Sequence, residues 1–214
     1  MSRLIVNEIF HSIQGESSRS GLPCVFVRLT ACNLRCTYCD TAYAFTEGTP
    51  ASLEEILTAI RQYRCHRVEI TGGEPLLQEG VHELMTRLCD LGYEVLLETS
   101  GSLDISAVDG RVRRIVDFKC PGSGMQEKNL WGNVPLLRAT DEVKFVVAGR
   151  ADFDWSLARA REEGLLGRVP VIVSPVFGQV DPADLAAWVL ESGEEIRMQI
   201  QLHKVIWDPS RRGV

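Results

Sequence analysis

The chain has 214 residues, of which 45% are hydrophobic and 24% charged, and its net charge is −6. This composition predicts one globular domain over residues 1–214, and no apolar run in the sequence approaches the length of a transmembrane helix. An acidic chain whose longest basic run is the pair Arg211 and Arg212 argues against direct binding to a nucleic acid backbone. We therefore expect a free small molecule as the substrate or ligand.

Short apolar runs rich in β-branched residues alternate with helical patterns along the chain. The predicted strands cover residues 4–10, 24–30, 67–71, 94–99, 112–118, 142–148, 169–174 and 197–203. Strands that alternate with helices favour parallel pairing through right-handed crossovers. The pattern therefore predicts an α/β fold with a mainly parallel sheet.

Capping patterns mark the starts of the predicted helices. Ser52 stands three residues before a glutamate, the spacing of a capping box, and apolar residues follow at helical spacing. The same stripe recurs over residues 81–88 and ends before a glycine. Asp152 is predicted to be the N-cap of a third helix, and Asp181 with Pro182 the N-cap and first residue of a fourth. These stripes predict core-facing surfaces.

Polar residues fall at or near the carboxyl ends of several predicted strands. They are Thr71, Thr99, Lys119, Ser174 and His203. In barrels built from parallel strands, functional groups gather at that edge. We therefore expect the site there.

The most specific motif is a cysteine triplet, Cys32, Cys36 and Cys39, with C-x3-C-x2-C spacing. Three thiolates in one short loop can hold three irons of a four-iron cluster and leave the fourth iron free to bind a small molecule. A structural zinc site is the alternative, but it needs a fourth ligand, which only a fold-back of His66 or Cys24 could supply. The spacing favours the cluster.

The remaining cysteines are scattered and stand mostly among apolar neighbours. They are Cys24, Cys65, Cys89 and Cys120. An odd total of seven in a chain of this length, with no apolar leader before Arg3, argues against a disulfide scaffold. We expect four small buried hydrophobes in a protein of the reducing cytoplasm.

The triplet resembles the cluster motif of the radical S-adenosylmethionine (SAM) superfamily. Residues 71–75, Thr-Gly-Gly-Glu-Pro, resemble that superfamily's glycine-rich SAM motif, whose glycines we expect to let backbone groups approach the ligand. The resemblance implies a reduced, partial (βα) barrel. It also implies a 4Fe-4S cluster whose open iron is chelated by SAM, and cleavage of SAM to methionine and a 5′-deoxyadenosyl radical.

Further segments resemble the 7-carboxy-7-deazaguanine synthase family along nearly the whole chain. They are residues 9–17, 26–29, 39–41, 98–101, 117–124 and 201–204. The resemblance implies a lyase that converts 6-carboxy-5,6,7,8-tetrahydropterin into 7-carboxy-7-deazaguanine with loss of ammonia, in the biosynthesis of queuosine and related 7-deazapurines. Hydrogen abstraction at C6 would start the reaction. Mg²⁺, a homodimer and an electron donor such as flavodoxin or ferredoxin are implied as well.

The family motif assigns roles to individual residues. Cys32, Cys36 and Cys39 would hold iron, and Thr41 would coordinate Mg²⁺, a hard ion suited to oxygen ligands. The implied SAM residues are Tyr38, Cys39, Asp40, Gly72, Gly73, Glu74, Ser100, Asp117, Phe118, Lys119, Ser174, Pro175, Val176 and Phe177. Within 117–119 only the lysine matches other members, which carry Ser-Pro-Lys there.

The implied substrate residues surround the cluster motif in the sequence. They are Ile13, Gln14, Gly15, Glu16, Arg28, Thr71, His203 and Val214. Arg28 can form two parallel hydrogen bonds to a substrate carboxylate, and Glu16 can accept from the donor edge of a pterin. In some relatives the C-terminal carboxylate reaches the substrate, although the tail after His203 is longer here than in short relatives.

Two other classes of function compete with this interpretation. One is a radical SAM activase that abstracts hydrogen from a partner protein, and the other is a metal-binding module without catalysis. The irregular segment 120–137 could be a lid, a partner surface or a solvated loop. Turnover of a free pterin would separate these alternatives.

Overall fold

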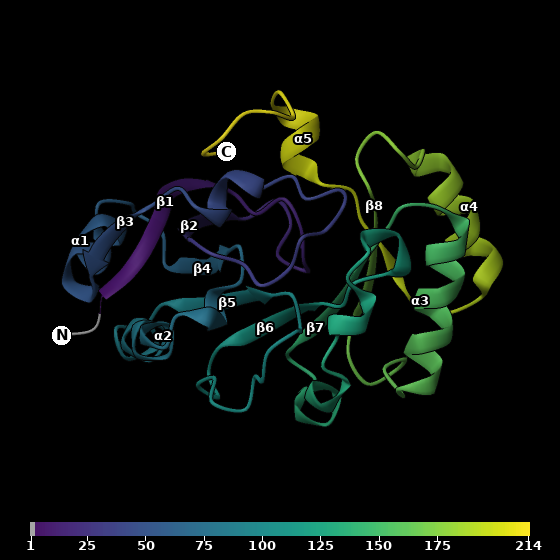
Figure 1. Ribbon diagram of the computed structural model, residues 1–214, viewed down its shortest axis with the longest axis horizontal. Coiled ribbons are helices and arrows are strands. Elements are labelled where there is room, and N and C mark those ends of the chain that lie inside the picture. Colours follow the sequence, from purple (N-terminus) through teal and green to yellow (C-terminus); the bar gives the residue numbers. More distant parts are fainter. Residues whose placement is uncertain (1–2) are drawn as a thin grey trace.

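The computed structural model describes residues 3–214, which form one curved sheet with helices on its outer side (Figure 1). The strands are β1 (Arg3–Ile13), β2 (Pro23–Leu29), β3 (Thr49–Ser52), β4 (Arg67–Gly72), β5 (Glu94–Thr99), β6 (Arg113–Asp117), β7 (Glu142–Val147), β8 (Val171–Pro175) and β9 (Arg197–Met198). Their order is β3-β1-β2-β4-β5-β6-β7-β8-β9. β1 pairs antiparallel with β2 and β3, and every later pair is parallel. The sheet stays open between β3 and β9, which confirms the partial barrel.

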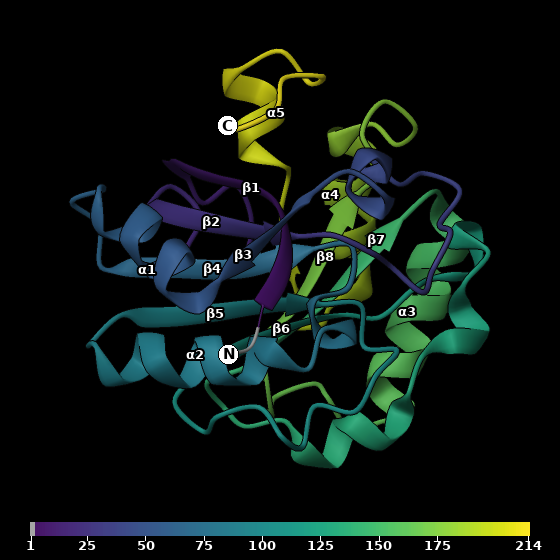
Figure 2. The same ribbon diagram turned by 60° about the vertical axis from the view of Figure 1, so that its left-hand side comes forward.

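Four helices cover the outer face of this sheet. They are α1 (Leu53–Arg61), α2 (Gly80–Asp90), α3 (Arg150–Glu162) and α4 (Pro182–Ser192), and a short α5 (Leu202–Ile206) lies apart from them (Figure 2). The capping box at Ser52 is confirmed, because its hydroxyl accepts the N–H of Glu55 and its own N–H donates to the Glu55 carboxylate. Asp181 likewise caps α4 through the N–H of Ala183. Within residues 3–214 no helix is long and apolar enough to span a membrane.

Three local predictions were wrong. Asp152 is not an N-cap, since α3 begins at Arg150 and Asp152 instead accepts the N–H groups of Gly122 and Ala148, both at 2.9 Å. The predicted strand 197–203 pairs only over β9, because the chain then turns into α5 and carries His203 on a helix. β3 was missed since it is four residues long and contains Pro50, which an edge strand tolerates.

Successive side chains of a strand point to opposite faces, and here the two faces differ in chemistry. The side chains that pack against the helices are apolar: Val25, Val27, Val68, Ile70, Val95, Leu97, Val143, Phe145 and Val147. The side chains of the inner face include Phe26, Arg28, Glu69, Thr71, Glu98, Asp117 and Lys144. The alternation thus places the core outside the barrel wall and polar groups inside it.

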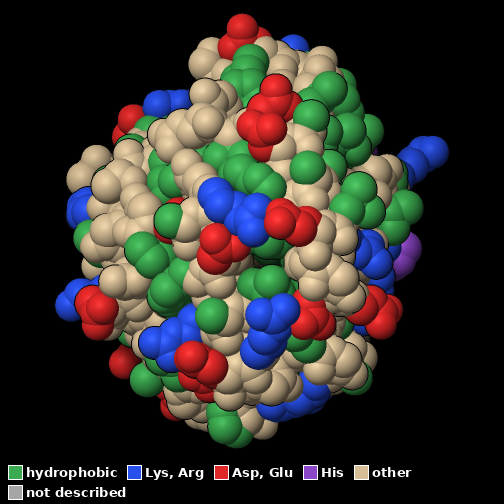
Figure 3. Space-filling view, turned by 90° about the vertical axis from the view of Figure 1, so that its right-hand side faces the viewer, with side chains coloured by type: hydrophobic (Ala, Val, Ile, Leu, Met, Phe, Trp, Pro, Cys, Tyr) green, Lys and Arg blue, Asp and Glu red, His purple; other side chains and the backbone are tan. Residues whose placement is uncertain are grey.

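The outer surface of α3 and α4 has mixed charge, which Figure 3 shows as neighbouring acidic and basic side chains. Arg150 pairs with Asp154 at 2.8 Å and with Glu191 at 2.7 Å, and Arg161 pairs with Glu194 at 2.9 Å. Exposed ion pairs of this kind contribute about 0 to 1 kcal/mol each. This face is therefore a solvated one on which several charges are paired.

The segment 120–137 is ordered against the core and is not a freely solvated loop. It forms three short 3₁₀ turns, Pro121–Ser123, Gln126–Lys128 and Trp131–Leu136. The Trp131 ring stacks on Phe118 with centroids 4.5 Å apart, and the buried Asn133 amide donates to the carbonyl of Leu103 at 2.8 Å. These contacts fix the segment beside the carboxyl end of β6.

Candidate active site

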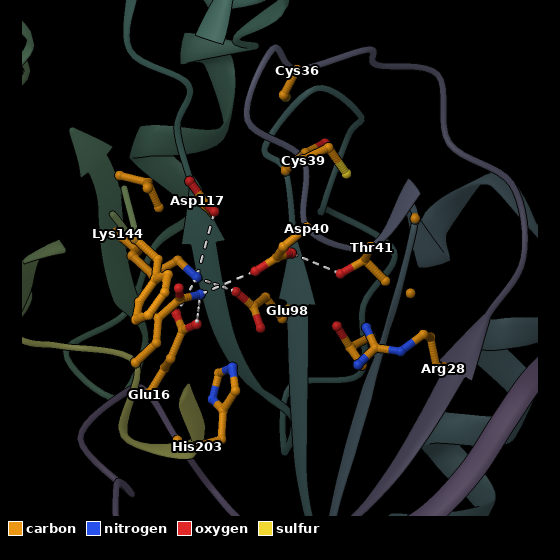
Figure 4. A pocket seen from close by; sticks show the side chains of 18 of the residues that line it. Glu16, Arg28, Cys36, Cys39, Asp40, Thr41, Glu98, Asp117, Lys144 and His203 are labelled. Atoms are coloured by element: carbon orange, nitrogen blue, oxygen red, sulfur yellow. Dashed lines mark hydrogen bonds and ion pairs between the residues drawn. The ribbon is translucent and has the colours of Figure 1, made fainter. Parts of the chain in front are cut away.

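A cavity of about 540 Å³ opens at the carboxyl ends of the parallel strands (Figure 4). Its lining comes from the inner faces of β1, β2, β4, β5, β6 and β7, from the loop after β2, and from the C-terminal residues 201–214. This is the edge at which the sequence placed the site. Segments far apart along the chain therefore meet in one space.

The three motif cysteines all face this cavity. Cys32, Cys36 and Cys39 carry free thiols, and the backbone of the loop folds so that the N–H of Cys39 donates to the carbonyl of Cys36 at 3.2 Å. The loop is fixed at two further points. The hydroxyl of Thr37 donates to the carbonyl of Gly122 at 2.8 Å, and that of Tyr38 to Val146 at 3.0 Å. Three soft thiol ligands on one wall fit an iron–sulfur cluster with an open corner.

The two candidates for a fourth zinc ligand do not line the cavity. Cys24 is fully buried beside Phe10 and Phe26, and His66 precedes β4, at the opposite end of the strand from the cluster loop. Cys120 is also fully buried, as expected, while Cys65 and Cys89 are half-buried. Neither Cys24 nor His66 can therefore act as a fourth ligand beside the three cysteines.

The glycine motif packs against the cluster loop. A Cβ atom at Gly72 would lie 2.2 Å from the carbonyl oxygen of Leu29, and one at Gly73 would lie 2.2 Å from that of Ala31. The N–H of Glu74 donates to the same Ala31 carbonyl at 2.8 Å. These glycines are thus required for close packing of two backbones, a requirement that differs from the ligand access expected from the sequence.

Most of the implied SAM residues line the cavity. Those that do are Tyr38, Cys39, Asp40, Gly72, Gly73, Ser100, Asp117, Lys119, Val176 and Phe177. Glu74, Phe118, Ser174 and Pro175 are buried outside its lining. The Glu74 carboxylate accepts from Thr99 and Ser100, and Phe118 packs in the core, so these two side chains hold the wall together.

All eight implied substrate residues line the cavity. The Arg28 Nε donates to Glu8 at 2.8 Å, and the guanidinium lies 5.8 Å from the Phe10 ring centroid and 5.9 Å from that of Tyr43. Its terminal nitrogens have no hydrogen-bond partner within residues 3–214 and point into the cavity in Figure 4. Gln14 differs, because its backbone N–H and carbonyl are used in the turn after β1, and its buried amide donates to Glu69. Gln14 therefore has a structural role in the cavity wall, whereas the terminal nitrogens of Arg28 are available to bind a ligand.

Gly15 packs directly on His203. A Cβ atom there would lie 2.1 Å from Nδ1 of His203 and 3.0 Å from its Cγ, so an added methyl group displaces the ring. Burial lowers the pKa of His203, so the imidazole is neutral at neutral pH. We expect Gly15→Ala to raise the KM for the substrate by about tenfold or more, since small displacements of positioning groups are costly.

Steady-state kinetics with Gly132→Ala as the control would check this, because a Cβ atom at Gly132 meets nothing nearer than 4.0 Å. An unchanged KM in Gly15→Ala would show that the position of His203 does not affect substrate binding.

The C-terminal residues close one side of the cavity. The N–H of Leu202 donates to the carbonyl of Gly15 at 3.0 Å, and the Lys204 ammonium lies 2.5 Å from the Asp40 carboxylate. Arg212 pairs with Glu47 at 2.8 Å, and Val214 reaches the lining. Burial would raise the pKa of Asp40, but Lys204 outweighs it and holds that pKa well below its ordinary range.

Three charged residues of the inner face were missed from the sequence: Glu69, Glu98 and Lys144. The Lys144 ammonium lies 2.5 Å from Glu16 and 3.5 Å from Asp117, and it also pairs with Glu98. Burial would lower the pKa of Lys144, but these carboxylates raise it well above its usual value. The sequence contained a signal for them, because a charged residue inside an otherwise apolar strand of a barrel is expected to point to the interior.

Comparison with known proteins agrees with this fold and site. The model of the radical SAM superfamily matches residues 27–171, so the chain has the fold and cluster loop of a radical SAM protein. It is 47% identical to the 7-carboxy-7-deazaguanine synthase of Chlorobaculum tepidum, with 99% of this chain and 97% of that protein aligned. The enzyme of the same name from Koribacter versatilis is 45% identical, over 98% and 99% of the two chains.

A solved structure shows the same architecture. The crystal structure of QueE from Escherichia coli superposes with a TM-score of 0.74 at 23% identity, and covers 94% of this chain and 95% of its own. The full-length similarity to the curated enzymes is decisive. The chain belongs to the 7-carboxy-7-deazaguanine synthase family of the radical SAM superfamily.

Proposed function

We propose that this chain converts 6-carboxy-5,6,7,8-tetrahydropterin into 7-carboxy-7-deazaguanine and ammonia, as a lyase of 7-deazapurine and queuosine biosynthesis. Full-length similarity to enzymes named for this product supports the reaction. One structural observation carries the assignment of the site: the three motif cysteines and the free guanidinium fork of Arg28 face the same cavity. Radical chemistry and recognition of an anionic substrate are thereby brought into one space.

The residues present fit a 4Fe-4S cluster and SAM. Cys32, Cys36 and Cys39 are free thiols on one loop, and the neighbouring strand ends present backbone groups at Gly72 and Gly73. When bound, the reduced cluster with SAM supplies the radical that takes a hydrogen atom from C6 of the substrate. The remaining SAM residues named above and lining the cavity would hold the nucleoside and the methionine end.

The opposite side of the cavity suits a pterin with a carboxylate. Arg28 would bind the carboxylate through its two terminal nitrogens, and Glu16 would accept from the donor edge of the ring. The Lys144 ammonium outweighs the burial of Glu16 and holds its pKa below the usual value, so Glu16 is an ionised acceptor. Thr71, the neutral His203 imidazole and the carboxylate of Val214 would complete this half.

Thr41 would coordinate Mg²⁺ between the two halves. Its hydroxyl lies at the cavity, where it donates to Asp40 at 2.8 Å, and its oxygen is a ligand of the kind that Mg²⁺ prefers. We expect Thr41→Ala to raise the Mg²⁺ concentration for half-maximal rate by about tenfold, which corresponds to about 1.4 kcal/mol of binding free energy. Thr46→Ala, an exposed threonine outside the cavity, is the matched control. A Thr41→Ala response to Mg²⁺ identical to wild type would remove Thr41 from the metal site.

The same proposal includes the domain organisation, the oligomeric state, the localisation and the electron donor. We expect one domain over residues 1–214, a homodimer, and a cytoplasmic enzyme reduced by a flavodoxin or a ferredoxin. Family membership supports the need for an electron donor, because the cluster has to be reduced before SAM is cleaved. Sedimentation analysis would test the dimer.

The deciding experiment is anaerobic turnover of the reconstituted protein with 6-carboxytetrahydropterin, SAM, Mg²⁺ and a strong reductant, followed by mass spectrometry. SAM-dependent formation of 7-carboxy-7-deazaguanine is the expected result. Cleavage of SAM with an untouched pterin would keep the radical machinery and overturn the substrate, and would favour an activase. Colourless protein with one zinc per chain would overturn both the iron–sulfur cluster and the substrate.

A further inference from the structure

Two carboxyl groups face each other at the floor of the cavity. Glu69 on β4 pairs in register with Leu96 of β5, and Glu98 lies two residues further along the same strand, so both side chains point inward. Both line the cavity, on adjacent strands of the sheet. The residue Glu69 is 1% exposed, whereas the side chain of Glu98 is 24% exposed and faces the space where the substrate would lie.

This pair has to hold a proton. Two carboxylates that face one another away from water repel each other, so one of them holds a proton unless cations offset both charges. Lys144 pairs with Glu98, while within residues 3–214 no cation pairs with Glu69, which accepts only from the Gln14 amide. The proton therefore belongs mainly to Glu69, and the negative charge to Glu98.

The groups packed around the pair support this assignment. Facing it are Glu16 after β1, the Cys24 thiol of β2, Asp117 of β6 and Lys144 of β7. Burial and the charges of Glu98 and Glu16 raise the pKa of Glu69 well above its usual value. Burial also raises the pKa of Glu98, although Lys144 opposes it. Both shifts favour a proton on the pair, and the larger one favours it on Glu69.

The proposed reaction needs a proton donor and a proton acceptor at its end. Loss of ammonia breaks a carbon–nitrogen bond, whose electron pair leaves with the nitrogen, and the nitrogen takes up a proton. A ring carbon then releases a proton as the pyrrole ring becomes aromatic. Substrate and products balance without an oxidant or a reductant, so one proton given and one taken back complete the step.

We propose that Glu98 and Glu69 perform this proton exchange, with Glu98 as the group that touches the substrate and Glu69 as the proton store behind it. Glu69 first passes its proton to the Glu98 carboxylate, and the Glu98 carboxyl group then gives this proton to the leaving nitrogen. The Gln14 amide stabilises the carboxylate then formed on Glu69. The proton released by the ring carbon returns through Glu98 to Glu69. The inference rests on the proposed function and adds to it the source of the proton.

The experiment uses the reconstituted enzyme with substrate deuterated at C6. Glu69→Gln keeps the size of the side chain and can still accept from Gln14, but it stores no transferable proton. We expect deuterium to enter 5′-deoxyadenosine at close to the wild-type rate, while release of ammonia and product falls by roughly 100-fold. A rearranged species with the mass of the substrate should accumulate. Glu142→Gln, a buried strand glutamate outside the cavity, is the control.

A second measurement does not depend on turnover. Infrared spectra of the wild-type protein at neutral pH should contain a protonated carboxyl band that is missing in Glu69→Gln, and the fall of the wild-type rate on raising the pH should be missing too. Wild-type product release in Glu69→Gln, or no protonated carboxyl in the wild type, would overturn the proposal. A wild-type enzyme that cleaves SAM and leaves the pterin intact is a different result, which overturns the proposed function instead.

Discussion

Replacing Cys36 by alanine is expected to abolish SAM cleavage while the fold is retained. Cys36 lies in the loop after β2, lines the cavity, and makes no contribution to the apolar core that joins the sheet to its helices. With two thiolates left, one iron of the cluster loses its protein ligand, and the open corner that would bind SAM is no longer held in place. We expect no detectable 5′-deoxyadenosine above the background of the assay.

Three measurements on the same samples would check this prediction. They are 5′-deoxyadenosine by mass spectrometry, iron content with the visible spectrum, and the midpoint of thermal unfolding. Cys89→Ala is the control, since Cys89 is half-buried on α2, away from the cavity, and should keep both the cluster and the cleavage. Substantial 5′-deoxyadenosine from Cys36→Ala would contradict the assignment of this cysteine to iron.

The parallel core of the fold could be predicted because its signals are local. Runs such as those of β4, β5 and β7 are short, largely apolar and bounded by helices or turns, so their bounds follow from the sequence to within a residue or two. The errors have local causes as well. Alternation at Ile196, Met198 and Ile200 imitates a strand, yet only β9 finds a partner, and the chain then turns because Leu202 bonds to Gly15.

The residues of the candidate site also fall into those that the sequence could predict and those that needed the structure. The cysteine triplet and the glycine motif are contiguous, so one loop reveals them. The floor formed by Glu69, Glu98 and Lys144 depends on the register of separate strands, which decides whether charges in different segments meet. The role of Gln14 also needed the structure, because only its partners show that the amide is used inside the wall.

Replacing Lys144 by methionine is expected to have the largest effect on stability of any single change at the site. The Lys144 side chain is 5% exposed and pairs with Glu16, Glu98 and Asp117, of which Asp117 also pairs with Lys119 at 2.9 Å. Removal of one partner from a buried charge pair leaves uncompensated carboxylates, and costs roughly 3 to 5 kcal/mol of the free energy of unfolding. Chemical denaturation of Lys144→Met against wild type would measure it.

The pH dependence of that loss separates an electrostatic cause from a packing cause. Without the ammonium, burial is the largest influence left on Glu16 and Glu98, and the charge of Glu16 adds to it at Glu98, so their pKa values in the folded state rise above those in the unfolded state. Such groups stabilise the fold while protonated, and this contribution is lost as the pH rises through the folded pKa. The deficit of Lys144→Met should therefore grow from about pH 5 to about pH 8.

Lys128→Met, at an exposed lysine, should show neither the loss nor its pH dependence. A deficit that is equal at both pH values would mean that Lys144 stabilises the wall through its alkyl chain, and that its charge does not balance the floor. In that case Glu16 would not depend on Lys144 to stay ionised, and its proposed role as acceptor for the pterin would need another source of charge.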